Sequence, residues 1–383
     1  MTVQLLDPIQ SDEPRPGDEI AVWDIGVRLF HWSLVIVVAT ALTTGFLAPR
    51  NWIDIHVIAG TVIAALLLYR IVWGFLGSTY ARFGSFVVGP ITAVQHAFDL
   101  ARGRGHRHVG HNPVGTMMIL GLLAAVLALT VTGVLALAGV IKEGPLAPFT
   151  SYTAGNIAKE IHELLAFGLL GLIGLHLIGV VMESLRTREN LVRGMVNGRK
   201  HVTADDHKAA AVEARPMAAG MLAVISIVVV GAGVWHWSAQ PALGVPMVAL
   251  DPLYVKECSA CHTAHHPSLA PTSTWNAIMA GLGDHFGDNA TLEPAQADAI
   301  AAYLFRNSAQ AFDTKAANRL RMSDPAGSSR LTETPGWKRL HRHVDAAAFK
   351  QPKVAGKLNC AACHGDAASG RFNPRSIAIP REN

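Results

Sequence analysis

Residues 161–182 form an apolar stretch long enough to cross a lipid bilayer as one helix, and this stretch constrains the fold most strongly. Apart from Glu163 at its start, its polar side chains are His162 and His176. In an α-helix their separation of 14 positions spans about 21 Å and falls about 40° short of four whole turns. The two imidazoles therefore lie on nearly the same face, one near each side of the bilayer. Histidine inside a membrane is costly and usually functional, often as a metal ligand; the alternative is a hydrogen bond to a neighbouring helix.

Four further stretches are long and apolar enough to cross a bilayer, namely residues 29–48, 56–77, 114–139 and 218–237. Half of the 383 residues are hydrophobic and only 16% are charged, as in membrane proteins. Residues 1–20 are polar and acidic without an apolar core, so we expect the first span to act as an uncleaved signal anchor.

The distribution of Lys and Arg predicts the orientation of the chain. The connections after the second and fourth spans are rich in basic residues, whereas the other connections are poor in them. Basic loops stay in the cytoplasm, so the N-terminus is expected inside and everything after Trp237 outside. The net charge of +4 is small and gives no nucleic-acid surface.

Two further histidines lie at the same two depths in the membrane as His162 and His176. His31 lies near the cytoplasmic end of the first span, and His56 begins the second span at the outer side. His56 therefore pairs by depth with His162, and His31 pairs with His176. Two histidines facing each other across a helix bundle are what a six-coordinate haem b needs. Four unconnected structural histidines are the alternative.

Other polar residues near the cytoplasmic side have two possible roles each. The histidines of the loop after the second span could form a metal site or lie in a solvated loop: His96, His106, His108 and His111. Arg70, toward the end of the second span, could pair with a haem propionate or extend to the cytoplasmic surface.

All four cysteines lie in two CxxCH motifs within the polar region that follows residue 240. The motif residues are Cys258, Cys261 and His262 in CSACH, and Cys360, Cys363 and His364 in CAACH. In a CxxCH motif both thiols form thioethers to the haem vinyl groups, and the histidine binds the iron. Zinc would need four ligands where each motif offers three. Haem c is attached outside the bacterial cytoplasm, which agrees with the predicted orientation.

The second axial ligand of each haem c stays open between histidine and methionine. His285 and Met279 are far enough from the first motif to return over its haem, whereas His265 and His266 project from the side of His262. Candidates for the second motif are His341, His343 and Met322. Histidine ligation gives a lower reduction potential than methionine.

Residues 20–200 resemble the bacterial cytochrome b561 and nickel-hydrogenase b-type cytochrome family. The resemblance rests on VWDIGVRLFHW around His31, YRIVWGFLGSTYARF at the end of the second span, HNPVG before the third, and the His162/His176 pair. In that family these four histidines bind two haems b, and quinone is the usual membrane partner.

Residues 250–383 resemble the periplasmic dihaem cytochrome c family. The similar segments are ECSACHTAHHPSLAPTSTW, GLGDHFGDNATL, ETPGWKRLHRHV and NCAACHGDAASGRF. That family is bis-histidine ligated, which by motif position implies His285 and His341 as the second ligands. Its members can accompany a b-type cytochrome and a small oxygen-binding monohaem cytochrome c. The chain departs from both families by fusing them through a fifth helix.

We therefore expect an all-α protein of the bacterial inner membrane. Residues 1–20 are a polar tail, 21–200 a four-helix membrane domain with two haems b, 201–240 a cytoplasmic linker and fifth helix, and 241–383 a mostly α periplasmic domain with two haems c. The predicted function is electron transfer from the quinol pool through haems b and c to a periplasmic acceptor such as a soluble cytochrome c, which would make the protein a quinol:cytochrome c oxidoreductase. A homo-oligomer is compatible with this sequence.

Two other functions fit the same features. The protein could pass electrons inward from superoxide or another outer donor to quinone. It could also anchor a hydrogenase or dehydrogenase in the membrane, with the c-type domain as a docking module. Haem potentials would test the first alternative, and co-purification the second.

Overall fold

The computed structural model of the chain describes residues 19–48, 52–104, 107–201, 212–247, 249–321 and 329–380. Five described helices are long and apolar enough to cross a membrane, which confirms the five predicted spans. They are α1 (Ile25–Phe46), α2 (Ile53–Leu76), α5 (Pro113–Ala136, extended by the π-helix η3, Leu137–Ile141), α6 (Tyr152–Thr187) and α8 (Pro216–Ser238). Helix α6 extends beyond the predicted span at both ends, so that His162 lies well inside the helix.

Shorter elements connect the spans on one side of the bundle. They are β1 (Glu19–Ala21), η2 (Thr79–Ala81), α3 (Phe83–Phe86), α4 (Pro90–Ala101), α7 (Leu191–Asn197) and β2 (Arg199–His201). Strands β1 and β2 pair antiparallel, with Glu19 opposite His201. The start and the end of the four-helix segment are therefore joined by backbone hydrogen bonds.

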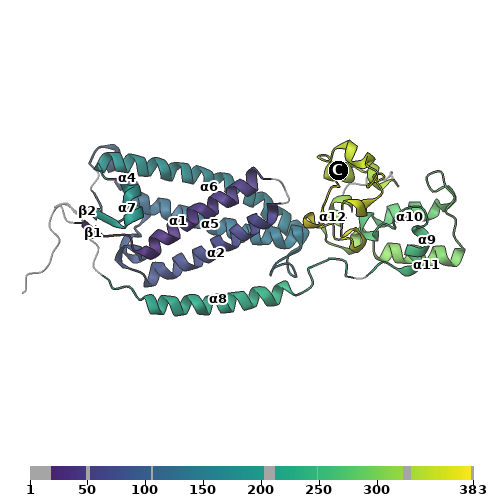
Figure 1. Ribbon diagram of the computed structural model, residues 1–383, viewed down its shortest axis with the longest axis horizontal. Helices are drawn as coiled ribbons and strands as arrows, with labels where there is room; N and C mark the ends of the chain where they lie inside the picture. Colours follow the sequence, from purple (N-terminus) through teal and green to yellow (C-terminus); the bar gives the residue numbers. More distant parts are fainter. Residues whose placement is uncertain are drawn as a thin grey trace, which may run out of the picture. The chain divides into compact units, whose positions relative to one another are not determined.

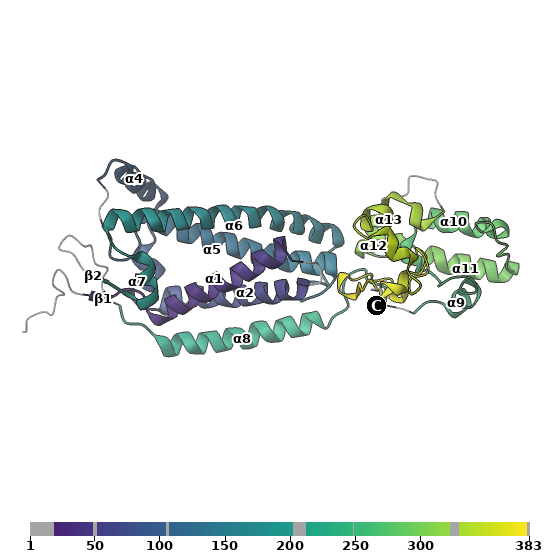
Figure 2. The ribbon, with the colours of Figure 1, turned by 45° about the horizontal axis from the view of Figure 1, so that its top comes forward.

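The chain divides into two compact units. One comprises Met1–Ala48, Asp54–Thr130 and Glu163–Val229, and the other comprises Pro49–Ile53, Val131–His162 and Val230–Asn383. In the first unit, α1, α2, α5 and α6 lie side by side and bury a shared apolar core (Figures 1 and 2). This core contains Val38, Ile63, Leu67, Val126 and Leu169.

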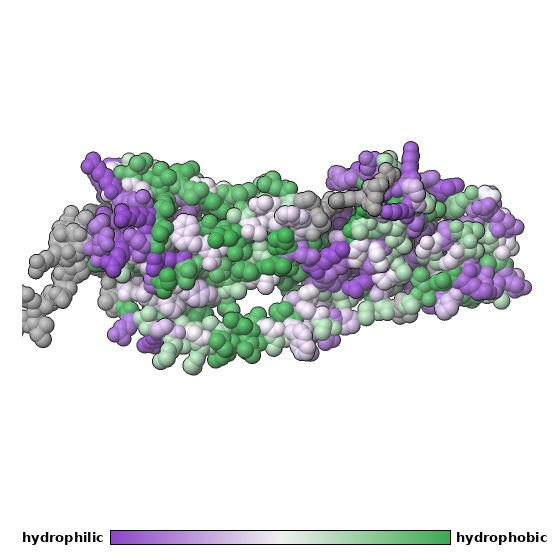
Figure 3. Space-filling view, in the orientation of Figure 1, coloured by the Kyte–Doolittle hydropathy of each residue, from purple (hydrophilic) through white to green (hydrophobic). Residues whose placement is uncertain are grey.

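Apolar side chains also cover the outside of these helices and of α8 (Figure 3). Ile36 is 66% exposed, Leu164 72% and Ile227 67%. Leucine and isoleucine at such exposures would be unfavourable over so wide a surface in water, whereas lipid tails solvate them well. The outer faces therefore fit a lipid environment.

Asp24 fixes the start of α1 against the end of α2. Its carboxylate caps α1 by accepting a hydrogen bond from the Val27 amide at 2.8 Å. The same carboxylate accepts hydrogen bonds from the Trp73 indole at 3.0 Å and from the Ser78 hydroxyl. These residues belong to the motifs VWDIG and WGFLGS, so the two motifs meet in space.

Arg70 does not extend to the cytoplasmic surface. Its side chain is buried, it donates a hydrogen bond to the Ala81 carbonyl at 3.1 Å, and its guanidinium lies 4.9 Å from the centre of the Phe83 ring. The interpretation as a side chain extending to the surface was wrong, because the turn after α2 folds back over α2 and supplies both partners.

Among the loop histidines, the structure describes three of the four, and His106 lies outside the described residues. His96 is buried and its ring lies edge-on to that of His108, with the centroids 5.2 Å apart. His111 packs against Trp23 and Phe86, with centroids 4.5 and 4.7 Å away. Burial lowers the pKa of His111 to about 3, so its imidazole is neutral. At His96 and His111 the segment is therefore packed rather than solvated.

The C-terminal part of the second unit consists of short helices separated by loops. Its α-helices are α9 (Pro252–Cys258), α10 (Thr272–Ala280), α11 (Pro294–Arg306), α12 (Lys315–Arg321) and α13 (Pro335–Leu340). Its 3-10 helices are η4 (Pro267–Leu269), η5 (Leu282–Asp284), η6 (Ala309–Ala311), η7 (Leu331–Glu333), η8 (Ala346–Lys350), η9 (Cys360–Ala362), η10 (Ala367–Ser369) and η11 (Pro374–Ser376). One core packs Tyr254, Trp275, Ile300 and Leu304, and another packs Leu269, Leu320 and Trp337.

Candidate haem sites

His56 lies one turn inside the start of α2, and its ring is oriented by α1. Its Nδ1 atom lies 3.1 Å from the Ala41 carbonyl oxygen and 3.2 Å from the Thr44 hydroxyl. A carbonyl oxygen can only accept, so Nδ1 carries the proton. The other ring nitrogen, Nε2, is then unprotonated, which is the form that binds iron, and the hydrogen bond fixes the ring for that role.

His162 on α6 has a similar environment provided by α5. Its Nδ1 atom lies 3.2 Å from the Thr132 hydroxyl. The residue after Thr132 is Gly133, whose Cβ, if it had one, would lie 3.2 Å from Cε1 of His162. A Cβ on Gly45, which follows Thr44, would lie 3.3 Å from Cε1 of His56.

A threonine–glycine pair thus stands beside each of these two histidines. The threonine orients the imidazole, and the glycine keeps space beside it. We did not predict these residues from the sequence. The signal was present as a Thr-Gly dipeptide near the end of each span that precedes a histidine-bearing span.

His31 and His176 approach each other inside the first unit. Their imidazoles interact electrostatically. The Nδ1 atom of His31 is buried and has no hydrogen-bond partner within the described part of the chain. A buried ring nitrogen without a partner is costly, and coordination of a metal would remove that cost. His31 and His176 are therefore close enough to interact, as their predicted common depth in the membrane requires.

The first CxxCH motif lies at the end of α9, and η5 brings a second histidine to it. The rings of His262 and His285 are nearly parallel, with centroids 6.3 Å apart and planes inclined by 23°. Metal–imidazole bonds of about 2 Å, as at zinc, allow one metal ion between rings at this separation. Nδ1 of His262 donates to the Thr263 carbonyl at 2.9 Å, which leaves Nε2 for the metal. His265 also stacks on His262, but at 5.0 Å the two rings are too close for an ion in line between them.

The second CxxCH motif lies beside the end of α13. The ring centroids of His341 and His364 are 6.1 Å apart. Nδ1 of His341 donates to the Trp337 carbonyl at 2.9 Å, whereas Nδ1 of His364 is buried without a hydrogen-bond partner among the described residues. The separation fits an iron between the two rings, as at the first motif.

The other candidates for second axial ligands have different surroundings. Met279 packs against the core around Tyr254 and Trp275. His343 is exposed, and its Nε2 atom accepts a hydrogen bond from Arg342 at 2.8 Å. Met322 lies outside the described residues. The geometry therefore brings His285 and His341, and not Met279 or His343, to the motif histidines.

Burial favours the neutral form of three of these imidazoles, those of His285, His341 and His364. Desolvation lowers the pKa of His285, and the nearby His262 lowers it further. Desolvation likewise lowers the pKa values of His341 and His364. Because only a neutral imidazole has a lone pair to offer, the low pKa values favour binding of iron.

Replacing Gly133 by leucine is expected to prevent haem binding at His162, because a side chain there fills the space beside the imidazole. The reduced b-type absorbance of the purified protein should fall to about half, since the His31/His176 site stays intact. Gly121→Leu is the matched control on the same helix, where no atom lies within 4 Å of the added Cβ. Equal haem content in the two variants would contradict the role of Gly133.

Comparison with known proteins matches the membrane helices and the C-terminal domain to two different families. A family model for prokaryotic cytochrome b561 matches residues 22–198. The probable Ni/Fe-hydrogenase 1 B-type cytochrome subunit of Escherichia coli K12 is 27% identical over 215 residues, which cover 47% of this chain and 90% of that protein. The corresponding probable subunit of Rhizobium leguminosarum is 23% identical and covers 47% of this chain and 88% of its own length.

A second family model, for dihaem cytochrome c, matches residues 254–372. The crystal structure of a dihaem cytochrome c purified from Rhodobacter sphaeroides is 37% identical in sequence, and the match covers 33% of this chain and all of that one, with a TM-score of 0.27. A dihaem cytochrome c from Shewanella baltica is 32% identical over 34% of this chain and 92% of that one, with a TM-score of 0.28.

These matches cover both sets of candidate ligands. Haem b is thus the cofactor of the helix bundle, and haem c is the cofactor of the C-terminal domain. The C-terminal domain belongs to the dihaem cytochrome c family, and residues 22–198 match the model of the prokaryotic cytochrome b561 family, so that the chain is a membrane b-type cytochrome with a dihaem cytochrome c domain that takes part in electron transfer.

Proposed function

We propose that the protein oxidises membrane quinol and passes the electrons through two haems b to two haems c and on to a soluble periplasmic acceptor. The observation that supports this proposal is that one chain carries four histidines on its membrane helices and brings a second histidine to each CxxCH histidine in its C-terminal domain. In the C-terminal domain the ring centroids are 6.3 and 6.1 Å apart.

In this proposal each haem b is held by two histidines and each haem c by one CxxCH motif and one further histidine. His56 pairs with His162 at the outer level, as their places along the helices suggest, and His31 pairs with His176 at the inner level. His262 pairs with His285, and His364 with His341. When bound, the haems supply the redox chemistry, and the protein sets the ligands, the spacing and the polarity around each iron.

The acceptor, in the same proposal, is a soluble cytochrome c or a small oxygen-binding monohaem cytochrome. The domain limits are those expected from the sequence: residues 1–20, 21–200, 201–240 and 241–383. The protein lies in the bacterial inner membrane with its N-terminus in the cytoplasm and residues 241–383 in the periplasm. Chains associating as a homo-oligomer would each keep a complete set of ligands.

Half of the haem is expected to be covalently bound. Acid–acetone extraction of the purified protein should remove the two haems b and leave the two haems c, because thioether bonds resist the treatment. Pyridine haemochrome spectra before and after extraction measure the ratio. A ratio of haem b to haem c far from one to one would reject the proposed cofactor set.

Quinol oxidation itself is tested by mixing the oxidised protein in lipid nanodiscs with duroquinol under anaerobic conditions. The b-type and c-type absorbances should both rise within the same turnover. Absence of b-type reduction in a protein that dithionite reduces fully would refute quinol as the donor.

A reporter fused after Asn383 tests the orientation. Alkaline phosphatase, which folds only outside the cytoplasm, is expected to be active at this position, because the proposed topology places the C-terminal domain in the periplasm. Green fluorescent protein becomes fluorescent only in the cytoplasm when it is fused to a membrane protein of this kind. Its fusion at the same position should therefore be dark. Fluorescence at this site would overturn both the topology and the outward direction of electron flow.

A second candidate function is that of a membrane subunit serving a hydrogenase. The names of the relatives from Escherichia coli and Rhizobium leguminosarum favour it. Co-purification of a hydrogenase with the tagged chain from its native membrane would support this function. The protein isolated alone, with full quinol oxidation activity, would argue against it.

A further inference from the structure

The loop between α5 and α6 is held to the C-terminal domain by a buried ion pair inside the second unit. The Lys142 ammonium group lies 2.7 Å from Oδ2 of Asp313, and only 5% of Lys142 is exposed. The same carboxylate oxygen accepts a hydrogen bond from the Tyr152 amide at 2.7 Å, and Oδ1 accepts one from the Asn318 side chain at 3.0 Å. A buried lysine that lost its carboxylate would be left as an uncompensated charge, so this contact is strongly favoured.

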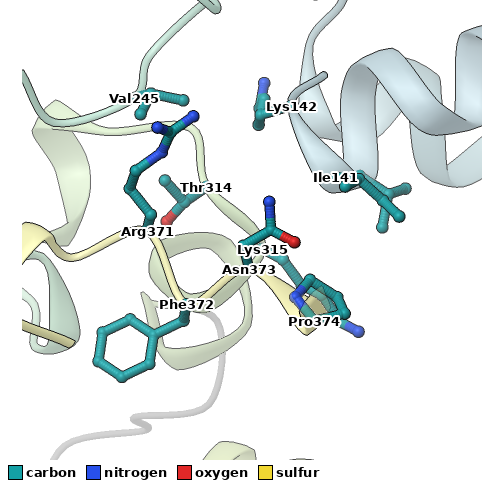
Figure 4. A pocket seen from close by; sticks show the side chains of 10 residues that line it. Ile141, Lys142, Val245, Thr314, Lys315, Arg371, Phe372, Asn373 and Pro374 are labelled. Carbon is teal, nitrogen blue, oxygen red and sulfur yellow. The ribbon is translucent and has the colours of Figure 1, made fainter. Parts of the chain in front are cut away.

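A second contact reaches the segment that follows the second CxxCH motif. The Glu143 carboxylate forms an ion pair with Arg375 and accepts a hydrogen bond from the Asn373 side chain at 2.6 Å. Asn373 and the neighbouring Pro374 lie beside Lys142 and Ile141 at the end of α5 (Figure 4). The loop thus supplies one basic and one acidic residue, Lys142 and Glu143, and the C-terminal domain supplies a residue of opposite charge to each.

The segment that carries Asn373 and Arg375 is itself hydrogen-bonded to the second haem motif. The Gly365 amide donates to the Ser376 carbonyl at 2.9 Å, and the Ala378 amide donates to the Cys363 carbonyl at 2.8 Å. The Asn373 amide also donates to the Asp366 carboxylate at 2.8 Å. Glu143 is therefore connected to the second CxxCH motif through this single hydrogen-bonded segment.

Helix α5 connects the same loop with the outer haem b site. Gly133, which lies against the His162 imidazole, precedes the end of η3 at Ile141 by eight residues. Eight helical residues span roughly 12 Å. His162, the loop at Glu143 and the second CxxCH motif are therefore parts of one continuous scaffold within the second unit.

The first CxxCH motif meets the second through His266. This residue is 4% exposed, lies four residues after His262, and has its Nδ1 atom 2.8 Å from the Ser268 hydroxyl. Gly370, six residues after His364, lies directly against its ring, since a Cβ there would come within 2.3 Å of Nδ1. The two c-type motif segments are therefore in contact, and an electron that reaches the second motif has a short route to the first.

Charge also separates the two halves of the C-terminal domain. Residues 329–380 contain nine Lys and Arg and three Asp and Glu, whereas residues 250–306 contain two basic and six acidic residues. An acidic surface suits encounter with a basic soluble protein.

We propose that electrons from the membrane haems enter the C-terminal domain at the haem of Cys360, Cys363 and His364 and leave it from the haem of Cys258, Cys261 and His262. The proposal rests on the proposed function and adds the order of the two haems c. Each step transfers one electron, so that one ferrous iron becomes ferric and the next ferric iron becomes ferrous. No covalent bond or proton changes place in these steps.

The order is tested with two double variants of the full chain, each lacking the attachment of one haem c. Duroquinol is mixed with the oxidised protein in nanodiscs, and the haems are followed by stopped-flow absorbance. In Cys258→Ser/Cys261→Ser the remaining haem c should be reduced at the native rate. In Cys360→Ser/Cys363→Ser the haems b should be reduced normally, while the remaining haem c is reduced at least 100-fold more slowly. The opposite pattern, or equal rates in both variants, would overturn the proposed order.

The order of the two haems c can also be tested without quinol, by following the oxidation of the same proteins. Protein reduced by dithionite is mixed with an excess of oxidised mitochondrial cytochrome c, a basic soluble acceptor. In Cys360→Ser/Cys363→Ser the remaining haem c should be oxidised quickly and the haems b slowly. Fast oxidation of the haems b in this variant would contradict the order, whatever the natural donor is. Failure of quinol to reduce the haems b in the native protein would instead refute the proposed function alone.

A charge swap tests the contact while all four haems stay bound. Glu143→Lys is expected to slow electron transfer from haem b to haem c about tenfold, and the double variant Glu143→Lys/Arg375→Glu should restore most of the rate. Glu333→Lys is the matched control, because Glu333 lies in the same basic half and pairs with Arg330 instead. A native rate in Glu143→Lys, or no recovery in the double variant that retains all haems, would count against entry at the second motif.

Discussion

Replacing His176 by alanine is expected to remove the inner haem b and leave the outer one in place. His31 would lose its facing imidazole in a buried site, and one axial ligand does not hold a non-covalent haem b tightly. His162→Ala should remove the outer haem b instead. Redox titration of the b-type absorbance in each purified variant should therefore show one b-type component of the native pair, and a different one in each variant.

His236→Ala is the control for these two variants. His236 lies near the end of α8, is exposed, and has its ring against Trp237. This substitution should leave both b-type components at their native potentials. If His162→Ala and His176→Ala lost the same component, the pairing of histidines by depth in the membrane would be wrong.

Replacing His341 by methionine is expected to raise the reduction potential of the second haem c by on the order of 100 mV, within the range of roughly 0.8 V that axial ligands cover. A thioether stabilises the ferrous state relative to an imidazole, so methionine ligation gives the higher potential. His285→Met should raise the potential of the first haem c in the same way. Near-infrared magnetic circular dichroism identifies the ligand pair directly, with bis-histidine bands in the native protein and a methionine band at one haem in each variant.

His343→Met is the matched control for His341→Met, because the two histidines are two residues apart and His343 is exposed and bonded to Arg342. It should change neither the spectrum nor the potential. A methionine-type band in the native protein would disprove bis-histidine ligation, and Met279 and Met322 would then be the residues to replace. Bis-histidine ligation at both haems would also mean low potentials, which suit a low-potential quinol such as menaquinol or a strongly oxidising acceptor.

The sequence alone determined the elements whose signals are local. A bilayer requires long apolar helices, so the five spans could be predicted from composition and length, and the structure has all five. The two CxxCH motifs place the thiols and the first axial histidine within five residues, and therefore indicate haem c without any knowledge of the fold. The resemblance to the two families, which the comparisons confirm, also rests on contiguous motifs.

Only the tertiary structure decided which distant groups meet. His341 and His343 are equivalent in sequence spacing, yet one ring lies 6.1 Å from that of His364 and the other is bonded to Arg342. The environment of Arg70 likewise depends on the turn that returns to cover it.

The contacts that tie the membrane helices to haem sites and to the C-terminal domain are also tertiary. Thr44 and Thr132 orient His56 and His162 from neighbouring helices, and Lys142 finds its carboxylate at Asp313, 171 residues later in the chain. Periodicity and motif spacing report on neighbours within one helix or one loop. Pairing across the chain depends on how these elements pack, because closing each long loop costs entropy that only the sum of packed contacts can offset.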